Sequence, residues 1–364
     1  MSMLDLKAID LPNNKTEEYR FTPVARVLQK TFPDGFGEGT TKETGSIDEF
    51  LIEGLDCTVI KVVDGLYEGI QGAHPSTDVF DQVNASLANG VLHIHSTGKP
   101  VFILNINTGS TNVHNRYSVK VESGSSICII EKTINLSSSP VFQTVSHEIS
   151  VHENARLEYY KIQNTPNIIE ICNTTITQKD NSHVNTFTLL TEGILVRNNL
   201  TIDIDGEHCE SHFHGLSLLK GETIGDHHTV VDHRKPNSFS NELYKGVMDD
   251  RSKGVFNGKI YVRPHAQKTN AFQSNRNILL TEHSTINTKP QLEIWADDVK
   301  CSHGCTTGQL DDEAMFYLQS RGISKTDARA MLLYAFAMQT TELIANEPLK
   351  TYIDRLISTR LYAQ

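Results

Sequence analysis

The middle of the chain, from about residue 76 to residue 307, is a succession of short apolar runs separated by polar turns. Val101–Ile106, Ser126–Ile130 and Asn185–Leu190 are examples, and each is rich in β-branched or aromatic residues. Such runs are typical of β-strands. Because no helical period of about ten residues or more occurs in this region, the pattern predicts strands throughout it.

Turn signals recur along these strands at Gly124, Asn154, Asn181 and Gly206, at intervals of 30, 27 and 25 residues. A repeat of this length in an all-β region indicates a solenoid or a propeller. The irregular spacing and the lack of a blade signature favour a β-solenoid, in which each coil stacks on the one before it. The pattern alone leaves a sandwich or a barrel open as equal alternatives.

The two ends of the chain have a different pattern. Within the N-terminal residues, a short helix is predicted at 14–29 and a glycine-rich loop at 34–39. From about residue 308 onward the pattern becomes helical. We therefore predict an N-terminal mixed or helical region at 1–75, the strand-rich domain at 76–307 and a C-terminal helical domain at 308–364.

Three helices are predicted in the C-terminal domain. The first spans 311–320 and ends before the stop residue Gly322. The second follows Ser324, which resembles a capping box with Asp327, and the third has Pro348 as a first helical residue. The apolar stripes are Ala314, Tyr317 and Leu318, then Ala328, Leu332, Ala335, Phe336 and Leu343, and last Leu349, Tyr352, Ile353, Leu356 and Ile357. Such helical caps close the end of a solenoid and also serve as docking surfaces.

Composition and charge narrow the class of protein. The chain has 364 residues, 38% of them hydrophobic, and a formal net charge of −11, which suits a globular protein and argues against broad binding to nucleic-acid phosphates. The longest apolar run near the C-terminus is Ala330–Met338, far shorter than the about 20 residues that a membrane helix needs. The first residues do not have the pattern of a secretory signal. We expect a cytoplasmic chain.

Two histidine-rich segments are candidates for chemistry. His208, Glu210, His212 and His214 alternate, so on a strand they share one face, which suits either a metal site with a further ligand from elsewhere or a solvated polar face. The segment 226–233 contains His227, His228 and the neighbours Asp232 and His233. Adjacent residues on a strand point to opposite faces, so this pair does not form a relay, and we expect a structural role.

The segment Cys301-Ser-His-Gly-Cys305 is the most specific candidate. On an extended backbone Cys301, His303 and Cys305 project from one side, and thiols with an imidazole suit zinc or the iron of a cluster. A closed zinc site needs a fourth ligand, and nothing nearby supplies one, so an open or shared site is favoured. The alternative is two buried thiols and a hydrogen-bonded imidazole. The other four cysteines are expected to be small buried hydrophobes.

Several segments resemble the SufB/SufD family of iron–sulfur cluster assembly proteins. They are Lys15–Thr22, Tyr244–Val262, Ala266–Asn275, Thr288–Gly304 and the stretch from Gly308 to Ile323. Within the family the chain is more similar to SufD than to SufB, because it is short and carries Lys300-Cys-Ser-His-Gly where SufB-like chains tend to have an acidic-His-acidic segment. No phosphate-binding loop or nucleophile turn is present, so a stand-alone ATPase or serine hydrolase is not expected.

The resemblance implies a right-handed parallel β-helix with a small N-terminal region and a C-terminal helical domain. It implies a non-catalytic scaffold that pairs with a SufB-like subunit and binds a SufC-like ATPase, with a homodimer as an alternative for the isolated chain. It places His303 and Cys301 at the SufB–SufD interface, where iron or a cluster is held transiently and only in the complex. The family usually has alanine at the position of Cys305, which we interpret as an accessory thiol.

The family also implies a docking surface for the ATPase in the C-terminal domain, with Leu310, Asp311, Phe316 and Tyr317 as its candidate residues. No cofactor is expected in the isolated chain, and neither nucleic acid nor a membrane is an expected partner. Two other functions stay open. One is a SufB-like subunit that itself receives sulfur and holds the nascent cluster, and the other is a metal-dependent β-helix enzyme that uses the histidines of 208–214.

Overall fold

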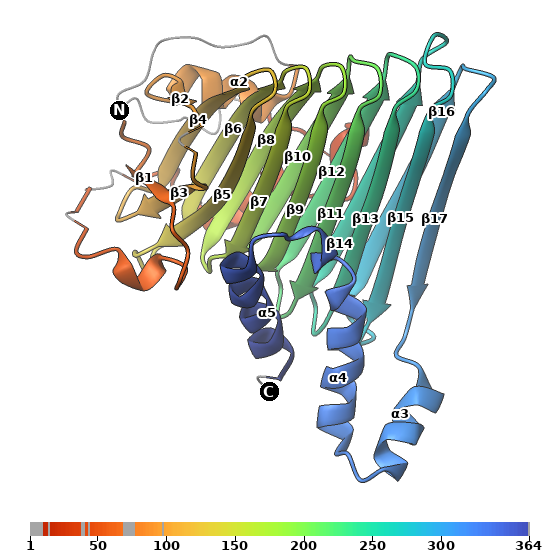
Figure 1. The fold of residues 1–364 in the computed structure, drawn as a ribbon. Coiled ribbons are helices and arrows are strands. Elements are labelled where there is room, and N and C mark those ends of the chain that lie inside the picture. Colours follow the sequence, from red (N-terminus) through yellow and green to blue (C-terminus); the bar gives the residue numbers. More distant parts are fainter. Residues whose placement is uncertain are drawn as a thin grey trace.

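The computed structural model describes residues 10–13, 15–37, 41–42, 44–67, 77–96 and 98–362. Within these residues the strands form a parallel β-solenoid of about seven turns, which Figure 1 shows as a row of stacked coils. Successive strands alternate between two sheets, one with nine strands and one with eight. The predicted solenoid is therefore confirmed, and the sandwich and the barrel are excluded.

The odd-numbered strands form the nine-stranded sheet, and the even-numbered strands form the eight-stranded sheet. The first sheet consists of β1 (Thr58–Val63), β3 (Val101–Asn107), β5 (Ser126–Asn135), β7 (Arg156–Asn164), β9 (His183–Glu192), β11 (Glu210–Leu219), β13 (Phe239–Met248), β15 (Asn270–Leu279) and β17 (Lys300–Gly308). The second consists of β2 (Leu92–Ile94), β4 (Asn112–Val121), β6 (Val141–Val151), β8 (Ile168–Gln178), β10 (Leu195–Ile204), β12 (Ile224–His233), β14 (Lys253–Val262) and β16 (Thr285–Ile294).

The recurring turns stack on one another from coil to coil. Gly124, Asn154 and Asn181 all have a positive φ, and the backbone amide of each donates to a carbonyl of the next coil at 2.8 to 2.9 Å. Glycine and asparagine tolerate this left-handed conformation better than other residues. The fourth turn differs from the prediction, because its positive φ of 56° belongs to His208. Gly206 is required there for another reason: a Cβ would lie 2.3 Å from the backbone of the preceding coil.

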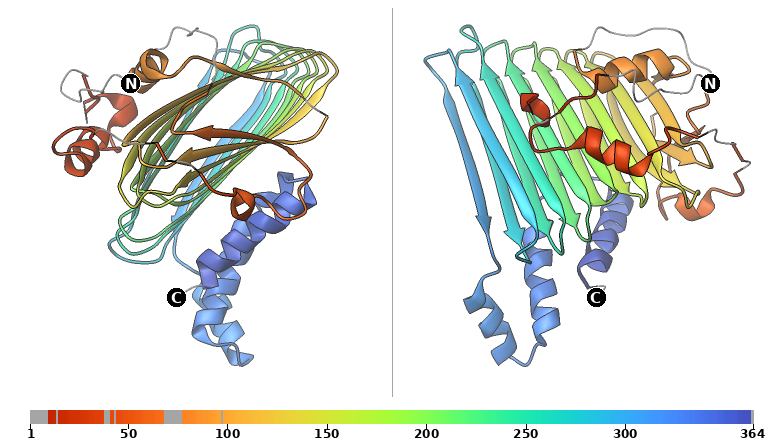
Figure 2. Two further views of the ribbon diagram at one scale, coloured as in Figure 1. Left: turned by 90° about the vertical axis from the view of Figure 1, so that its left-hand side faces the viewer. Right: turned by 180° about the vertical axis from the view of Figure 1, so that it is seen from behind.

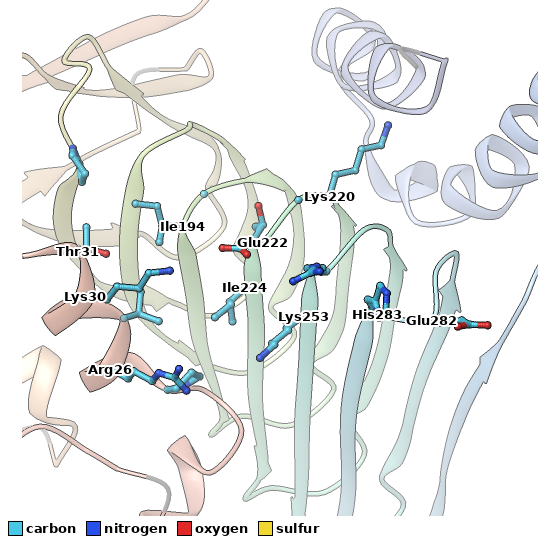
Figure 3. A pocket seen from close by; sticks show the side chains of 17 residues that line it. Arg26, Lys30, Thr31, Ile194, Lys220, Glu222, Ile224, Lys253, Glu282 and His283 are labelled. Atoms are coloured by element: carbon cyan, nitrogen blue, oxygen red, sulfur yellow. The ribbon is translucent and has the colours of Figure 1, made fainter.

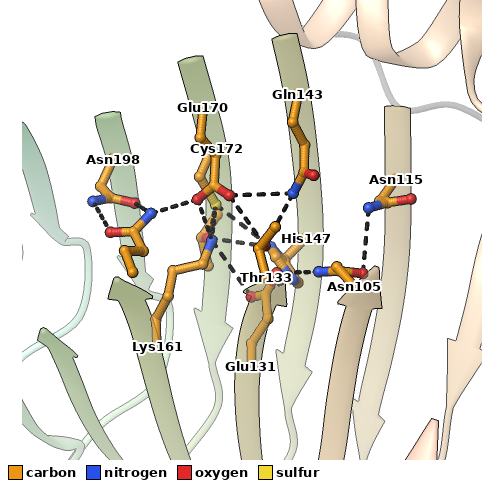
Figure 4. A network of polar contacts seen from close by, with 12 residues as sticks. Asn105, Asn115, Glu131, Thr133, Gln143, His147, Lys161, Glu170, Cys172 and Asn198 are labelled. Atoms are coloured by element: carbon orange, nitrogen blue, oxygen red, sulfur yellow. Dashed lines mark hydrogen bonds and ion pairs between the residues drawn. The ribbon is translucent and has the colours of Figure 1, made fainter. Parts of the chain in front are cut away.

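The space between the two sheets is filled by side chains, and part of that filling is ionic (Figure 4). The Glu131 carboxylate lies 3.1 Å from Nε2 of His147 and 3.4 Å from Nζ of Lys161. Lys161 Nζ also lies 2.6 Å from Sγ of Cys172. Cys172 is buried as predicted, but it belongs to this polar cluster and is not simply a small hydrophobe. Burial alone would lower the pKa of His147, but Glu131 overcomes this effect and raises the pKa to about 9.

The N-terminal segments cover the outer face of the eight-stranded sheet (Figure 2). They include the helical turn η1 (Glu17–Tyr19) and the helix α1 (Val24–Thr31). The helix α1 overlaps the range 14–29 in which a short helix was predicted and ends two residues after it. The buried Arg197 holds this segment to the sheet: its guanidinium lies 3.9 Å from the Tyr19 ring centroid and donates to the backbone oxygen of Glu18 at 2.9 Å. This contact gives the Lys15–Thr22 motif a structural role.

Two features between the N-terminal segments and the solenoid differ from the sequence pattern. A second helical turn, η2 (Asp48–Phe50), precedes β1, and the sheet starts with β1, well before residue 76. The predicted boundary at 75/76 itself lies outside the described residues. The helix α2 (Val79–Leu87) lies in the region predicted to contain only strands. The helix has nine residues, and the prediction had counted only helical periods of about ten residues or more. Its N-terminus is capped by Asp78, whose side chain accepts hydrogen bonds from the backbone amides of Phe80 and Asp81.

The C-terminal domain consists of α3 (Asp312–Ser320), α4 (Lys325–Met338), the turn η3 (Thr341–Leu343) and α5 (Glu347–Tyr362). Helices α4 and α5 pack on the outer face of the nine-stranded sheet, near the lower ends of its strands in Figure 1. Asp311 and Ser324 cap α3 and α4 through backbone amides, as the Ser324 motif predicted for α4. Within the described residues, no helix combines the length and apolar character that crossing a membrane requires.

The apolar stripe of α5 is confirmed in its central residues, whereas the predicted stripe of α4 is fully buried only at Ala328. Ile353 and Ile357 of α5 are buried. In α4 the residues Leu333 and Ala337 are buried, and the predicted Ala335 is exposed. The run Ala330–Met338 is apolar all the way round the helix, so periodicity could not identify the face that packs on the solenoid.

Candidate functional site

The solenoid has an open end at its last coil. β17 is the terminal strand of the nine-stranded sheet and β16 is the terminal strand of the eight-stranded sheet. Among the described residues, no strand pairs with the outer side of either one. Terminal strands of this kind expose a row of backbone donors and acceptors that another strand can use.

The predicted cluster on 301–305 lies on the terminal strand β17. Its three residues are in register with Ala271, Gln273 and Asn275 of β15, which are buried between the two sheets. Cys301, His303 and Cys305 therefore face the interior side of the last coil, and they share one side of the strand as the spacing predicted. Since no further coil covers them, His303 and Cys305 are exposed, while the half-buried Cys301 packs against the apolar interior.

The two thiols of the cluster have different surroundings. Partial burial raises the pKa of the Cys301 thiol. Cys305 Sγ lies 2.8 Å from Oγ1 of Thr288 on β16 and 3.8 Å from Oδ1 of Asn275. β17 is a continuous strand with no turn at Gly304, so the two cysteines are about 13 Å apart and are not positioned for a disulfide.

A column of polar residues extends from His303 into the solenoid. Glu242 pairs in register with Gln273, and Gln273 pairs with His303 on the next coil. Gln273 Nε2 donates to Glu242 at 3.0 Å, and Thr229 donates to the same oxygen at 2.9 Å. Burial raises the pKa of Glu242 to about 7, against the opposing effect of these hydrogen bonds. The open end thus has a titratable carboxyl group beneath its exposed imidazole.

The described residues do not form a complete metal site among themselves. In the part of the chain that the structure describes, no group of three or more His, Cys, Asp or Glu side chains is arranged to hold a metal ion. At the open end the side chains with suitable donor atoms are the thiols of Cys301 and Cys305 and the imidazole of His303. Along an extended strand the Cα atoms of Cys301 and Cys305 are about 13 Å apart, so the three side chains do not converge on one ion.

The alternating residues of 208–214 are not brought together as a metal site. His208 lies in a turn before β11, whereas Glu210, His212 and His214 share the outer face of the strand. Glu210 pairs with His212 at 2.9 Å. His214 is buried, with Nδ1 3.0 Å from the carbonyl oxygen of Thr340, and burial lowers its pKa to about 4. The arrangement fits a polar strand face that is partly covered by the C-terminal domain.

The segment 226–233 has the alternating orientation that was predicted. Asp226 forms an ion pair with Arg197 at 2.6 Å, and its neighbour His227 contacts Ser217 at 3.0 Å instead. The side chains of Asp232 and His233 likewise diverge, and their respective partners are Arg263 at 2.8 Å and Ser240 at 2.8 Å. These contacts are structural.

A second exposed surface lies on α3. Phe316 and Tyr317 have exposed fractions of 74% and 57%, which are high for aromatic side chains. Tyr317 was predicted in the buried stripe of this helix, but α3 has no buried residue, because it extends away from the strands (Figure 1). Of the other two candidates, Leu310 is half-buried and Asp311 caps the helix. Exposed apolar side chains of this kind mark surfaces that bind other proteins.

Sequence reasoning missed the buried residues that support the site. The sequence analysis did not select Glu131, Lys161 or Glu242, because a single charged residue in a strand is normally expected to be exposed. A signal was present, because Glu131 and Lys161 are 30 residues apart, which is one of the repeat intervals. In a solenoid such residues stack in register, and opposite charges at that interval indicate an internal pair.

Comparisons with known proteins agree with this architecture. The family model described as "SUF system FeS cluster assembly, SufBD core domain" matches residues 103–336. The iron–sulfur cluster assembly protein SufD of Escherichia coli (strain K12) is 30% identical over 383 aligned residues, which cover 96% of this chain and 89% of that protein. A SufBD family protein of Synechocystis is 34% identical over 68% of this chain and 57% of its own length. A SufBD family protein of Mycobacterium tuberculosis (strain H37Rv) is 26% identical, over 91% of this chain and 85% of its own length.

Proposed function

Because the chain belongs to the SufBD family of iron–sulfur cluster assembly proteins, we propose that it is a SufD-like scaffold subunit that pairs with a SufB-like chain and binds a SufC-like ATPase. The observation that carries the proposal is the open end of the solenoid, where unpaired strand edges adjoin the exposed His303. In this role the chain performs no reaction of its own. Iron or the nascent cluster is cargo that the complex holds transiently.

The terminal strands provide the surface for the SufB-like chain. Addition of a strand to an exposed sheet edge forms main-chain hydrogen bonds along its whole length, and both terminal strands present such an edge side by side. Pairing there brings the partner next to His303 and Cys301. The partner then supplies further ligands, since the described residues of this chain arrange no complete site.

The chemistry of the two candidate ligands suits iron. A neutral imidazole is a common ligand of iron, and thiolates hold iron–sulfur clusters. His303 is exposed and free to turn toward a partner, whereas Cys301 packs partly against the interior. We therefore assign the main role to His303 and a supporting role to Cys301.

The ATPase binds at α3, which follows the terminal strand β17 in the chain. Phe316 and Tyr317 present two exposed rings, and α3 is joined to the solenoid through β17 at one end and through α4 at the other. A partner bound to α3 is therefore connected directly to the strand that carries His303. This connection allows an ATPase to influence the geometry of the open end.

The test of strand pairing uses a substitution that removes one outward backbone N–H. Lys300 donates its N–H to Thr269 on the neighbouring strand, so the N–H groups of odd-numbered residues in β17 point to the open side. Thr307→Pro removes such a group without breaking the ladder to β15, and Thr307→Val keeps it. The tagged chain is co-expressed with a SufB-like and a SufC-like subunit and purified by affinity and size-exclusion chromatography.

We expect a complex of all three subunits for the wild type and for Thr307→Val, and loss of the SufB-like subunit for Thr307→Pro. Retention of that subunit by Thr307→Pro would contradict pairing through β17. The isolated chain is also reconstituted with iron and sulfide without oxygen. A stable coloured cluster on the chain alone would favour the SufB-like function instead, in which the chain itself holds the cluster.

A further inference from the structure

A groove with a volume of about 1120 Å³ lies between α1 and the turns that precede the even-numbered strands (Figure 3). Basic side chains surround it, and we call it the basic groove. From α1 come Arg26 and Lys30, and from the solenoid come Arg251, Lys253 and His283. Lys220 also borders it but extends toward the C-terminal helices. The groove is separate from the 301–305 cluster and from α3.

The basic groove runs along the axis of the solenoid. Its lining includes Pro140, Ile194, Ile224 and His283, which lie next to or at the start of β6, β10, β12 and β16. From β6 to β16 the eight-stranded sheet advances five strands, so the groove is about 24 Å long at about 4.8 Å per strand. A fully extended peptide of about seven residues has this length.

Four of the basic side chains in the basic groove form no ion pair with another described residue. Across the described ranges, the side chains of Arg26, Lys30, Arg251 and Lys253 form no ion pair, and the acidic residues that line the groove are Glu222 and Glu282. The chain as a whole has 44 acidic and 33 basic residues, so basic side chains have ample opportunity to pair. A concentration of unpaired cations on an acidic protein indicates an anionic ligand.

The apolar residues that line the groove indicate which class of anionic ligand it can bind. Ile194, Ile224 and Val27 contribute apolar surface between the basic residues. No Phe, Tyr or Trp side chain of the described residues lines the groove, so it lacks the large rings on which the bases of a single-stranded nucleic acid usually stack. The cations are distributed over successive coils and along a helix, which suits a linear series of negative charges better than one compact anion.

We propose that the basic groove binds an extended acidic segment of another polypeptide. The carboxylates of the segment face Arg26 and Lys30 on one side and Arg251 and Lys253 on the other, while its apolar side chains rest on Ile194 and Ile224. Rows of opposite charge also steer the two proteins together and fix the register of the segment. This site is independent of the role proposed for the open end.

The experiment measures the fluorescence anisotropy of a labelled peptide of about ten residues that alternates glutamate and leucine, which exceeds the about seven residues that span the groove. The test variant of the full chain is Lys30→Glu with Lys253→Glu. The control is Lys61→Glu with Arg156→Glu, which changes the net charge equally at exposed positions outside the groove. Both are measured at low and at physiological salt, since screening weakens exposed charge pairs.

We expect the groove variant to bind the peptide about tenfold or more weakly and the control variant to stay within about twofold of the wild type. A peptide with glutamine in place of glutamate should bind no better to the wild type than the acidic peptide binds to the groove variant. Equal losses in both variants would overturn the proposal, because binding would then reflect net charge alone. Displacement of the peptide by tripolyphosphate with equal or higher affinity would also overturn it, in favour of a small-anion site.

Discussion

Cys305 Sγ on β17 lies 2.8 Å from Thr288 Oγ1 on β16, so the last strands of the two sheets are in contact across the open end. This contact fixes the C-terminal half of the 301–305 cluster to the scaffold. His303 precedes it by two residues and remains exposed. The open end therefore combines a fixed thiol with an imidazole that is available to a partner.

Replacement of His303 by alanine should separate the function of the open end from its stability. The side chain is exposed, so His303→Ala should leave the melting temperature and the assembly of the complex nearly unchanged, within about 0.5 kcal/mol of stability. Cluster formation in cells that lack the native subunit should fall strongly, because an imidazole ligand is lost. Normal activity of a reporter iron–sulfur enzyme in those cells would contradict the role of His303.

Replacement of Phe316 by aspartate should weaken binding of the ATPase. The ring is 74% exposed on α3 and makes little contribution to folding, so the variant should keep its melting temperature. A buried aromatic contact at an interface is worth about 2 kcal/mol or more, which corresponds to at least about a thirtyfold loss of affinity in calorimetry. Tyr362→Asp is the matched control, since Tyr362 is 45% exposed at the end of α5. An equal loss of ATPase affinity for both variants would show that the docking surface is not specific to α3.

The carboxyl group of Glu242 should make stability fall as the pH rises from about 4.5 to about 7. Its pKa is raised by burial to about 7, so between these values the native state binds a proton that the unfolded state has released. Stability is then highest below pH 4.5 for this group and is lost toward pH 7, in total on the order of 3 kcal/mol. Glu242→Gln should remove that slope and should be at least as stable as the wild type at pH 7.5.

The measurement for Glu242 is urea unfolding of both proteins at several pH values between 4.5 and 8. The difference in unfolding free energy between variant and wild type isolates this one group from the other carboxyl groups. A difference that stays constant over the whole range would show that Glu242 does not titrate near neutral pH in the folded chain.

The ion pair between His147 and Glu131 should make the stability of the fold depend on pH in a second, higher range. Glu131 raises the pKa of His147 to about 9 although burial opposes it, so His147 stabilises the folded state fully below pH 6.5 and loses this contribution as the pH rises to about 9. The wild type should therefore lose melting temperature between pH 7 and 9. In Glu131→Gln this loss should disappear, and the variant should be about 3 to 5 kcal/mol less stable at pH 7, because it removes the carboxylate that pairs with both His147 and Lys161 in the interior. Identical pH profiles for the two proteins would contradict the pair.

The sequence was informative about repetition and much less informative about orientation. The turns at Gly124, Asn154 and Asn181 gave the interval of the coils, because a left-handed turn needs particular residues and therefore leaves a signal. The apolar face of α4 left none, because the run Ala330–Met338 presents apolar residues in every direction. The basic groove left none either, since Lys30 and Lys253 are more than 200 residues apart and meet only after the N-terminal segment folds onto the sheet. The shared side of 301, 303 and 305 was predictable because it depends on strand geometry alone.

The two cysteines of the open end should differ in importance. Cys301 packs partly against the interior beside Ala271, and Cys305 is exposed with a hydroxyl partner on β16. Cys305→Ala removes one contact at the rim and introduces the alanine that the family resemblance implies at this position, so it should keep cluster formation and lose less than about 1 kcal/mol of stability. Cys301→Ala removes both a thiol beside His303 and apolar packing, so it should lower cluster formation more. Each variant is assayed in cells that lack the native subunit, with His303→Ala as the reference. A loss for Cys305→Ala as large as that for His303→Ala would mean that all three side chains act as ligands. The partner would then have to draw β17 out of its extended form, because the Cα atoms of Cys301 and Cys305 are about 13 Å apart on an extended strand.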